Sequence, residues 1–155
     1  RWAPTHGMTQ PWFFKIFMED GLKTFADFHA ETYKTNTVKE EFNEFKYQKL
    51  RENPLRSSAV IAICMKRQEL EKIPEIEEIE AVACAVQNMH LTATAYGLAA
   101  YWGTGGLTYT SEMKVFLGLK DKDRCLGFFF VGYPAKEWPK GQRKPIEYYT
   151  EWVIK

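Results

Sequence analysis

The sequence predicts an α+β fold in which a sheet lies between helices. Apolar runs of strand length alternate along the chain with amphipathic stretches at helical spacing, and no linker or internal repeat separates them. The length of 155 residues fits one domain, and 45% hydrophobic with 26% charged residues is an ordinary globular composition. We therefore expect a single domain over residues 1–155.

Two strands and two helices are predicted in the first half of the chain. Residues 11–18 (PWFFKIFM) are apolar and aromatic with proline at their head, which is typical of a buried strand. Apolar residues at helical spacing predict a helix over about 21–35. A charged surface helix follows within 39–53 and ends at an Asn-Pro pair. The β-branched run 57–66 (SSAVIAICMK) predicts a central strand buried on both faces.

A long helix is predicted next, from Pro74 to about Tyr96. Proline suits a first helical turn, and Gly97 is placed to end the helix. We interpret the acidic run at its start as a solvated helix end that matches the helix dipole, because no histidine joins it at metal-ligand spacing. Small residues inside it indicate a central core helix with a close neighbour; they are Ala81, Ala83, Ala85, Ala93 and Ala95.

The remaining elements are shorter. Residues 97–106 (GLAAYWGTGG) predict a strand that runs into a glycine-rich turn. A short helix follows, with Thr110 or Ser111 as its N-cap and Gly118 near its end. Residues 124–134 (RCLGFFFVGYP) predict a buried strand. The tail beyond it carries a basic cluster and then an aromatic, extended end.

Composition excludes several classes of protein. A net charge of +1 gives no electrostatic footprint for nucleic acid or an anionic membrane, and no apolar run is long enough to span a bilayer. Cys64, Cys84 and Cys125 each lie among apolar neighbours, so we expect three buried thiols in a reducing compartment, the cytoplasm by default. Without a Cys-x-x-Cys motif, we expect neither a thiol-redox pair nor a zinc site.

No catalytic template fits the sequence. There is no Gly-x-Ser-x-Gly, Walker or His-Glu-x-x-His motif, and the GTGG turn lacks the dinucleotide-binding spacing. His29 and His90 fall on helices without an acidic partner, so we interpret both as structural. We therefore predict no catalytic residue and no metal. A missing nucleophile and base fit a protein whose chemistry is carried by a bound cofactor, here something planar and anionic.

Three blocks of the sequence resemble the FMN-dependent nitroreductase family, most closely its small, minimal members. They are residues 3–17 (APTHGMTQPWFFKIF), 81–106 (AVACAVQNMHLTATAYGLAAYWGTGG) and 117–134 (LGLKDKDRCLGFFFVGYP), in the family's order and spacing. The resemblance implies a three-layer α+β homodimer with a mostly antiparallel sheet between helices and two FMN sites at the subunit interface. It also implies hydride uptake from NADH or NADPH and ping-pong reduction of a small-molecule acceptor, such as a nitroaromatic or a quinone.

The same resemblance implies roles for three segments. The opening loop matches the segment that reaches the partner subunit's flavin; its residues are Trp2, Pro4, Thr5, His6 and Met8. The turn formed by Trp102, Gly103 and Thr104 matches the segment along the flavin ring, where a glycine lets backbone N–H groups approach closely. In the tail, outside these matches, the positive charge of Arg143, together with Lys144, suits the FMN phosphate through charge-assisted hydrogen bonds, and a solvated basic patch explains it equally well. Residues 92–97 match a nicotinamide region or are simply part of a core helix.

One departure from the family pattern affects the prediction. Family members begin with a helix and an Arg- and Ser-containing motif that anchors the cofactor, and no such segment precedes the opening loop. We expect that the chain is a portion of a longer protein. Two alternatives to an enzyme remain: a flavin-binding storage or sensor module without turnover, and a domain that kept the fold and lost its cofactor.

Overall fold

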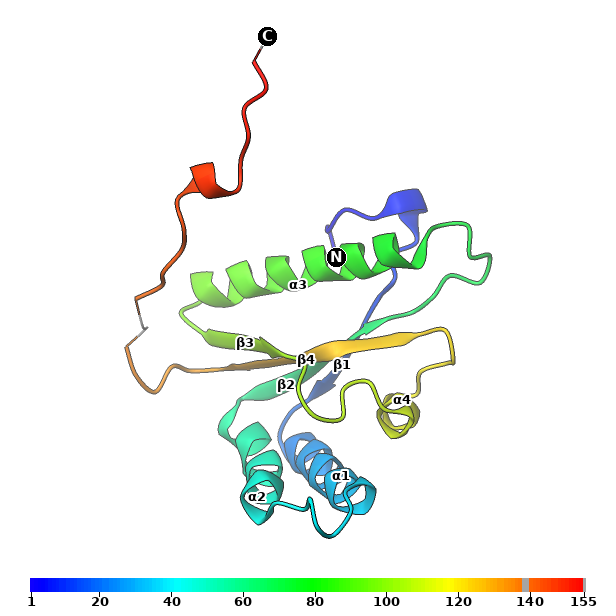
Figure 1. The fold of residues 1–155 in the computed structure, drawn as a ribbon, viewed down its shortest axis with the longest axis vertical. Coiled ribbons are helices and arrows are strands. Elements are labelled where there is room, and N and C mark those ends of the chain that lie inside the picture. Colours follow the sequence, from blue (N-terminus) through cyan, green and yellow to red (C-terminus); the bar gives the residue numbers. More distant parts are fainter. Residues whose placement is uncertain (138–139, 155) are drawn as a thin grey trace.

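Four antiparallel strands form one sheet in a computed structural model that describes residues 1–137 and 140–154 (Figure 1). The strands are β1 (Trp12–Phe17), β2 (Ala59–Met65), β3 (Ala99–Gly103) and β4 (Arg124–Gly132). Their order in the sheet is β1-β2-β4-β3, and every neighbouring pair is antiparallel. Strand β2 is central and buried along nearly its whole length, which confirms the prediction from its β-branched sequence.

Helices cover both faces of the sheet (Figure 1). The long helix α3 (Glu75–Ala95) lies on one face, and α1 (Asp20–Asn36), α2 (Glu44–Glu52) and α4 (Ser111–Leu117) lie on the other. Thr110 caps α4 by accepting a hydrogen bond from the Met113 backbone N–H, and Gly118 ends it in the left-handed conformation. After α2 the Asn-Pro pair opens a 3-10 turn, Asn53–Arg56.

The helices of the described ranges were also compared with the length and hydropathy that a membrane span requires, and none of them meets both.

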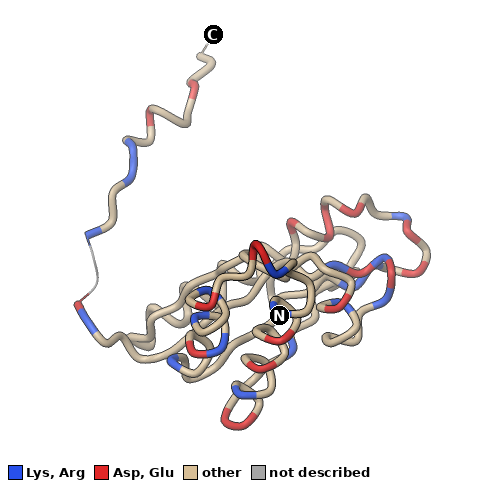
Figure 2. The backbone as a smooth tube through the Cα atoms, turned by 60° about the horizontal axis from the view of Figure 1, so that its bottom comes forward, with Lys and Arg blue, Asp and Glu red and all other residues tan. Residues whose placement is uncertain are grey.

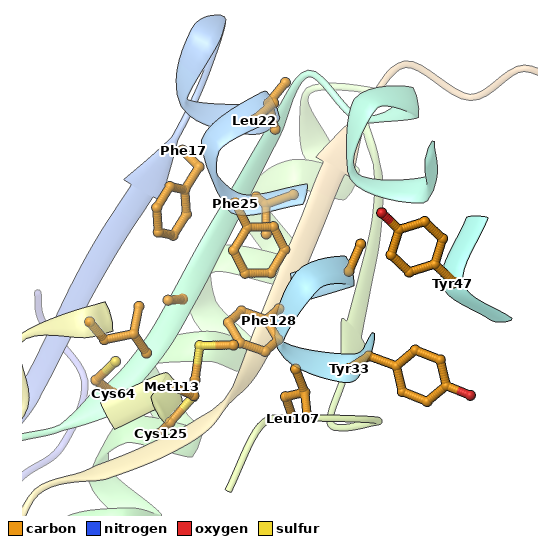
Figure 3. Packing of buried hydrophobic residues seen from close by; sticks show 14 residues of the cluster. Phe17, Leu22, Phe25, Tyr33, Tyr47, Cys64, Leu107, Met113, Cys125 and Phe128 are labelled. Carbon is orange, nitrogen blue, oxygen red and sulfur yellow. The ribbon is translucent and has the colours of Figure 1, made fainter. Parts of the chain in front are cut away.

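Two hydrophobic clusters hold the layers together. Phe25 and Phe128, both almost fully buried, lie at the centre of the cluster between the sheet and the three shorter helices (Figure 3). Their ring centroids are 4.9 Å apart. Val82, Val86 and Phe129 belong to the second cluster, beneath α3. The high phenylalanine content is thus largely explained by core packing.

A bulge in β4 shapes the edge of the sheet next to β3. The register between β2 and β4 shifts between Ile63 and Cys64, and Gly127 adopts a φ of +121° there. A Cβ at Gly127 would lie 2.5 Å from the Gly103 carbonyl oxygen, so only glycine fits beneath the end of β3. The Trp102 indole N–H donates a hydrogen bond to the Leu126 carbonyl oxygen at 3.0 Å.

The acidic start of α3 corrects the prediction of a solvated helix end. Glu78 is 1% exposed and forms a buried ion pair with Arg67, which comes directly after β2 and Lys66. Glu75 pairs with Arg124 of β4 at 2.7 Å. Arg67, after the end of β2, and Arg124, at the start of β4, both lie against the first turn of α3. Most of the acidic residues there are therefore paired within the fold rather than hydrated.

Helix α3 is also less central than its alanines predicted. Its inner face is buried, but Ala95 and most of the last helical turn are exposed, because no other described element lies over the outer side of this end of α3 (Figure 1). Cys84 lies on that outer side and is exposed, which corrects the prediction of three buried thiols. For residues 92–97 the core-helix interpretation holds only at Ala93.

The other two cysteines form a pair that sequence spacing did not reveal. Cys64 on β2 lies opposite Cys125 on β4, and both thiols are buried. Hydrogen bonding to Cys125, with burial, raises the pKa of the Cys64 thiol. The structure thus brings together two thiols that lie far apart in the sequence, and both are free and closed off from solvent.

The tail leaves the sheet after β4 and runs away from the body of the protein (Figure 1). Its basic cluster is the blue stretch in Figure 2, and its end is extended apart from a short 3-10 helix, Ile146–Tyr148. The exposed apolar residues of this end are Ile146, Tyr148, Tyr149, Trp152, Val153 and Ile154. Of the predicted tail, Trp138, Pro139 and Lys155 lie outside the described residues.

Candidate functional site

The opening loop has an unusual backbone. Gly7, Met8 and Gln10 all have positive φ values, of 58°, 56° and 45°. Such values are strained for Met and Gln, and strain of this kind often accompanies functional loops. The Thr5 hydroxyl holds the loop from inside: it lies 3.1 Å from the Thr9 hydroxyl and accepts a hydrogen bond from the Gln10 N–H at 3.2 Å. The loop is therefore a shaped segment rather than a frayed end.

His6 links the opening loop to α3. Its Nδ1 lies 2.5 Å from a carboxylate oxygen of Glu77, in the first turn of the helix. Beside this contact is an open surface pocket of about 670 Å³ with polar and apolar walls; they are Pro4, Thr5, His6, Glu77, Glu80, Ala81 and Cys84. Sequence reasoning missed Glu77, because no local signal connects residues 71 positions apart.

The rest of the loop borders a second, more apolar cavity, also of about 670 Å³. Trp2, Pro4, Thr5 and Met8 line it together with Arg1, Ala3, Gln10 and Trp12. Trp2 and Met8 are 88% and 75% exposed, so these apolar side chains are presented to solvent or to a ligand. The five loop residues singled out from the sequence thus lie around two adjoining cavities.

The second predicted segment lies at the end of β3. Trp102 and Gly103 belong to the strand, and the turn proper begins at Thr104. Among the described residues, the backbone N–H groups of Thr104, Gly105 and Gly106 donate no hydrogen bond, and all three residues are exposed. These donors are available to carbonyl or ring nitrogen acceptors of a ligand. Gly127, a glycine inside the apolar run of β4, was the sequence signal that another part of the backbone packs closely against this strand.

His29 of α1 lies beneath the glycine-rich turn. A Cβ at Gly106 would be 3.2 Å from its Nε2, so the turn packs directly on the imidazole ring. The ring is buried near Phe25 and Phe128, and its Nε2 has no hydrogen-bond partner among the described residues. Desolvation by burial lowers the pKa of His29 to about 4. The ring is therefore neutral at pH 7, in agreement with its interpretation as structural.

Arg143 lies on the tail, apart from both other segments (Figure 1). It is exposed, and its guanidinium donates to the neighbouring Gln142 carbonyl oxygen at 2.7 Å. Lys144 lies over the Tyr148 ring, with its Nζ 3.6 Å from the ring centroid. Within this one chain the structure brings the loop residues together, but it does not bring Trp102, Gly103 or Thr104 to them, nor Arg143 to either group.

The exposed groups suit a planar, anionic cofactor better than a metal. In the described ranges no three His, Cys, Asp or Glu side chains are grouped so that they could hold a metal ion. By contrast, the turn offers free N–H donors next to Trp102, and the tail offers cations. Flavin carbonyls and a phosphate need donors and charges of these kinds, so the residues present fit FMN.

Comparison with known proteins gives one consistent match. A model of the nitroreductase family matches residues 1–133. YdjA of Escherichia coli strain K12, provisionally named an NAD(P)H nitroreductase, is 27% identical over 132 residues, covering 85% of this chain and 70% of its own length. A solved nitroreductase-like family protein of Bacillus cereus is 26% identical with a TM-score of 0.77, covering 98% and 78% of the two chains. The FMN-dependent nitroreductase NfnB of Mycobacterium smegmatis, solved with NADPH, has the same fold: TM-score 0.71 at 14% identity, covering 98% and 83%.

Proposed function

This chain belongs to the nitroreductase family, and we propose that it is an FMN-dependent oxidoreductase that takes hydride from NADH or NADPH and reduces a small-molecule acceptor by a ping-pong cycle. Nitroaromatics and quinones are the acceptor classes that an open flavin pocket admits. The family match over residues 1–133 carries the proposal. The Mycobacterium smegmatis protein of the same fold is FMN-dependent and was solved with NADPH, which supports the choice of cofactors.

FMN, when bound, supplies the hydride chemistry, and this chain's residues hold it. The N–H groups at 104–106 would donate to the ring, with Trp102 beside it and Gly103 leaving room for close approach. Arg143 would bind the phosphate through charge-assisted hydrogen bonds. We assign no residue of the chain as acid or base in the hydride transfer itself.

We also propose that the site is completed in a homodimer. The opening loop, the turn and the tail each present ligand-binding groups, yet they lie apart in one chain (Figure 1). In a dimer, His6 and its neighbours would reach the partner's flavin. The exposed apolar end of the tail is a surface that a second copy would cover. The free thiols favour a reducing compartment such as the cytoplasm.

Titration of the protein with FMN tests this proposal. Gly103→Val should abolish loading, because the side chain would occupy the space that the flavin ring needs. The protein should remain folded, because the nearest atoms to the added Cβ belong to the exposed, movable ring of Tyr101. Arg143→Ala should weaken FMN binding by about 10- to 100-fold, through the loss of one charge-assisted contact. Lys140→Ala, on the same tail, is the matched control and should have little effect.

The outcomes separate the alternatives. Full loading of the Gly103→Val protein would show that the turn is not the ring site, and unchanged affinity in Arg143→Ala would make Arg143 a solvated basic residue. FMN that binds but is not reduced by NADH or NADPH would favour a storage or sensor module. If the protein takes up no FMN, the result would favour the third alternative, a domain that kept the fold and lost its cofactor.

A further inference from the structure

We propose that Glu77 is a positioning residue for His6, and that His6 so held donates a proton to the acceptor. This inference rests on the proposed function. The observation behind it is the 2.5 Å contact between the His6 Nδ1 and a Glu77 carboxylate oxygen. A carboxylate can only accept, so the neutral imidazole carries its proton on Nδ1 and leaves Nε2 free. Among the described residues, Nε2 of His6 has no hydrogen-bond partner.

Both partners are held from outside the contact. Gly7 and Met8, both with positive φ, shape the loop directly after His6, and a Cβ at Gly7 would lie 3.2 Å from Ile73 Cδ1, just before α3. Glu77 is fixed by the first turn of a 21-residue helix. The backbones of both residues are therefore held where the imidazole and the carboxylate meet, and a carboxylate in contact with one ring nitrogen sets the tautomer of the histidine.

Stability does not explain the pair. The two side chains are 62% and 38% exposed, and ion pairs this exposed contribute little to folding. The charged and titratable groups that share the cavity with His6 are Glu77, Glu80 and Cys84, all from α3. Of these, Glu77 alone hydrogen-bonds the ring among the described residues. The pair is thus better explained by what it does to the histidine than by what it adds to the fold.

The reaction provides a use for such a histidine. Hydride from NAD(P)H carries two electrons and one proton, whereas reduction of a quinone to its hydroquinone takes two electrons and two protons. The doubly protonated His6 ring supplies the second proton: its Nε2–H bond breaks as an O–H bond forms on the quinone. The ring returns to the neutral Nδ1–H form, and the one proton that the overall reaction consumes from the solvent then restores the Nε2–H bond.

The first arm of the test needs no cofactor. Histidine side-chain ¹⁵N shifts of the wild-type protein at pH 8 should show His6 as the Nδ1–H tautomer. Glu77→Ala should shift His6 toward the Nε2–H tautomer that free histidine favours, and Glu80→Ala, which removes the same charge from the same cavity, should leave the tautomer unchanged. A wild-type ring with its proton on Nε2, or no change in Glu77→Ala, would overturn the proposal.

The second arm measures the proton. In FMN-loaded protein reduced by NADPH, oxidation by 1,4-benzoquinone should slow by about 10- to 100-fold in Glu77→Ala and at least as much in His6→Ala. The double variant should be no slower than His6→Ala, because the two residues act as one unit. Glu71→Gln, in an exposed pair with Lys122, should be unaffected.

The two arms distinguish this proposal from the one on which it rests. A shifted tautomer with an unchanged quinone rate would refute the proton transfer. A chain that takes up no reducible FMN would refute the proposed function and the proton-donor role together, while the ¹⁵N shifts would still decide whether Glu77 orients His6.

Discussion

His29 should make the stability of this protein depend on pH. The ring is 7% exposed and packed near Phe25 and Phe128, and its Nε2 has no hydrogen-bond partner among the described residues. Desolvation by burial therefore lowers its pKa to about 4 from the ordinary value of 6.5. Protonation in the folded state would place a charge beneath the glycine-rich turn without a partner.

The magnitude follows from these two pKa values. Between pH 6.5 and pH 4 the unfolded chain binds a proton at His29 that the folded chain does not, so the free energy of unfolding falls as the pH is lowered through this window. Relative to pH 7, His29 removes about 2 kcal/mol by pH 5 and about 3 kcal/mol by pH 4. Above pH 7 both states are neutral there, and the contribution of His29 is constant.

Urea unfolding of wild-type protein and His29→Leu at pH 7, 6, 5 and 4 measures this effect. The leucine cannot ionise, so stability should fall less steeply in the variant, by about 2 kcal/mol between pH 7 and pH 5. Carboxylates whose pKa is lowered by hydrogen bonds, such as Asp27 and Glu71, titrate in both proteins and cancel in the difference. Parallel stability curves would refute the reasoning, since they would mean that the folded state accepts the proton at no cost.

Further predictions concern packing and thiols. Gly127→Ala should lower the free energy of unfolding by about 2 kcal/mol or more, because its Cβ would strike the Gly103 carbonyl oxygen at a φ of +121°; unchanged urea stability would contradict this. Arg67→Met should cost about 3–5 kcal/mol by leaving Glu78 buried and unpaired, and Glu78→Met in the same protein should restore much of it; additive losses in urea unfolding would refute that pairing. One thiol per folded chain, Cys84, should react rapidly with a thiol reagent, and fast reaction of more than one would contradict the buried pair.

Local patterns in the sequence predicted the fold well where local physics decides it. The β-branched run 57–66 became the central strand β2, and the caps at Thr110 and Gly118 bound α4 as expected. These features depend on side-chain periodicity and on backbone preferences of single residues, which the sequence displays directly.

Burial of particular side chains was harder to predict, because it depends on which elements meet. From the sequence alone, Glu78 belongs to an acidic run that is expected to be hydrated. Only the fold shows that Arg67, two residues after β2, pairs with it. Cys84 has apolar neighbours in sequence, yet it falls on the outer side of α3. The pairing of Cys64 with Cys125 needs the register of β2 against β4, including the bulge at Gly127.

The candidate site could be predicted only in pieces. Sequence blocks indicated the opening loop and the turn after β3, and the structure places groups suited to a ligand at both. Contacts between distant residues, such as Glu77 with His6 and Gly106 with His29, have no local signal. Under the proposed function, joining the loop, the turn and Arg143 into one site requires a second subunit, which a single chain does not contain.

A visible absorption spectrum of FMN-loaded protein, taken before and after anaerobic addition of NADH or NADPH, tests the central claim most directly. If the chain is an FMN-dependent oxidoreductase, the bound yellow flavin should bleach on addition and regain its colour when a quinone is admitted. Bound flavin that keeps its colour with both donors, or protein that stays colourless after incubation with FMN, would contradict the claim.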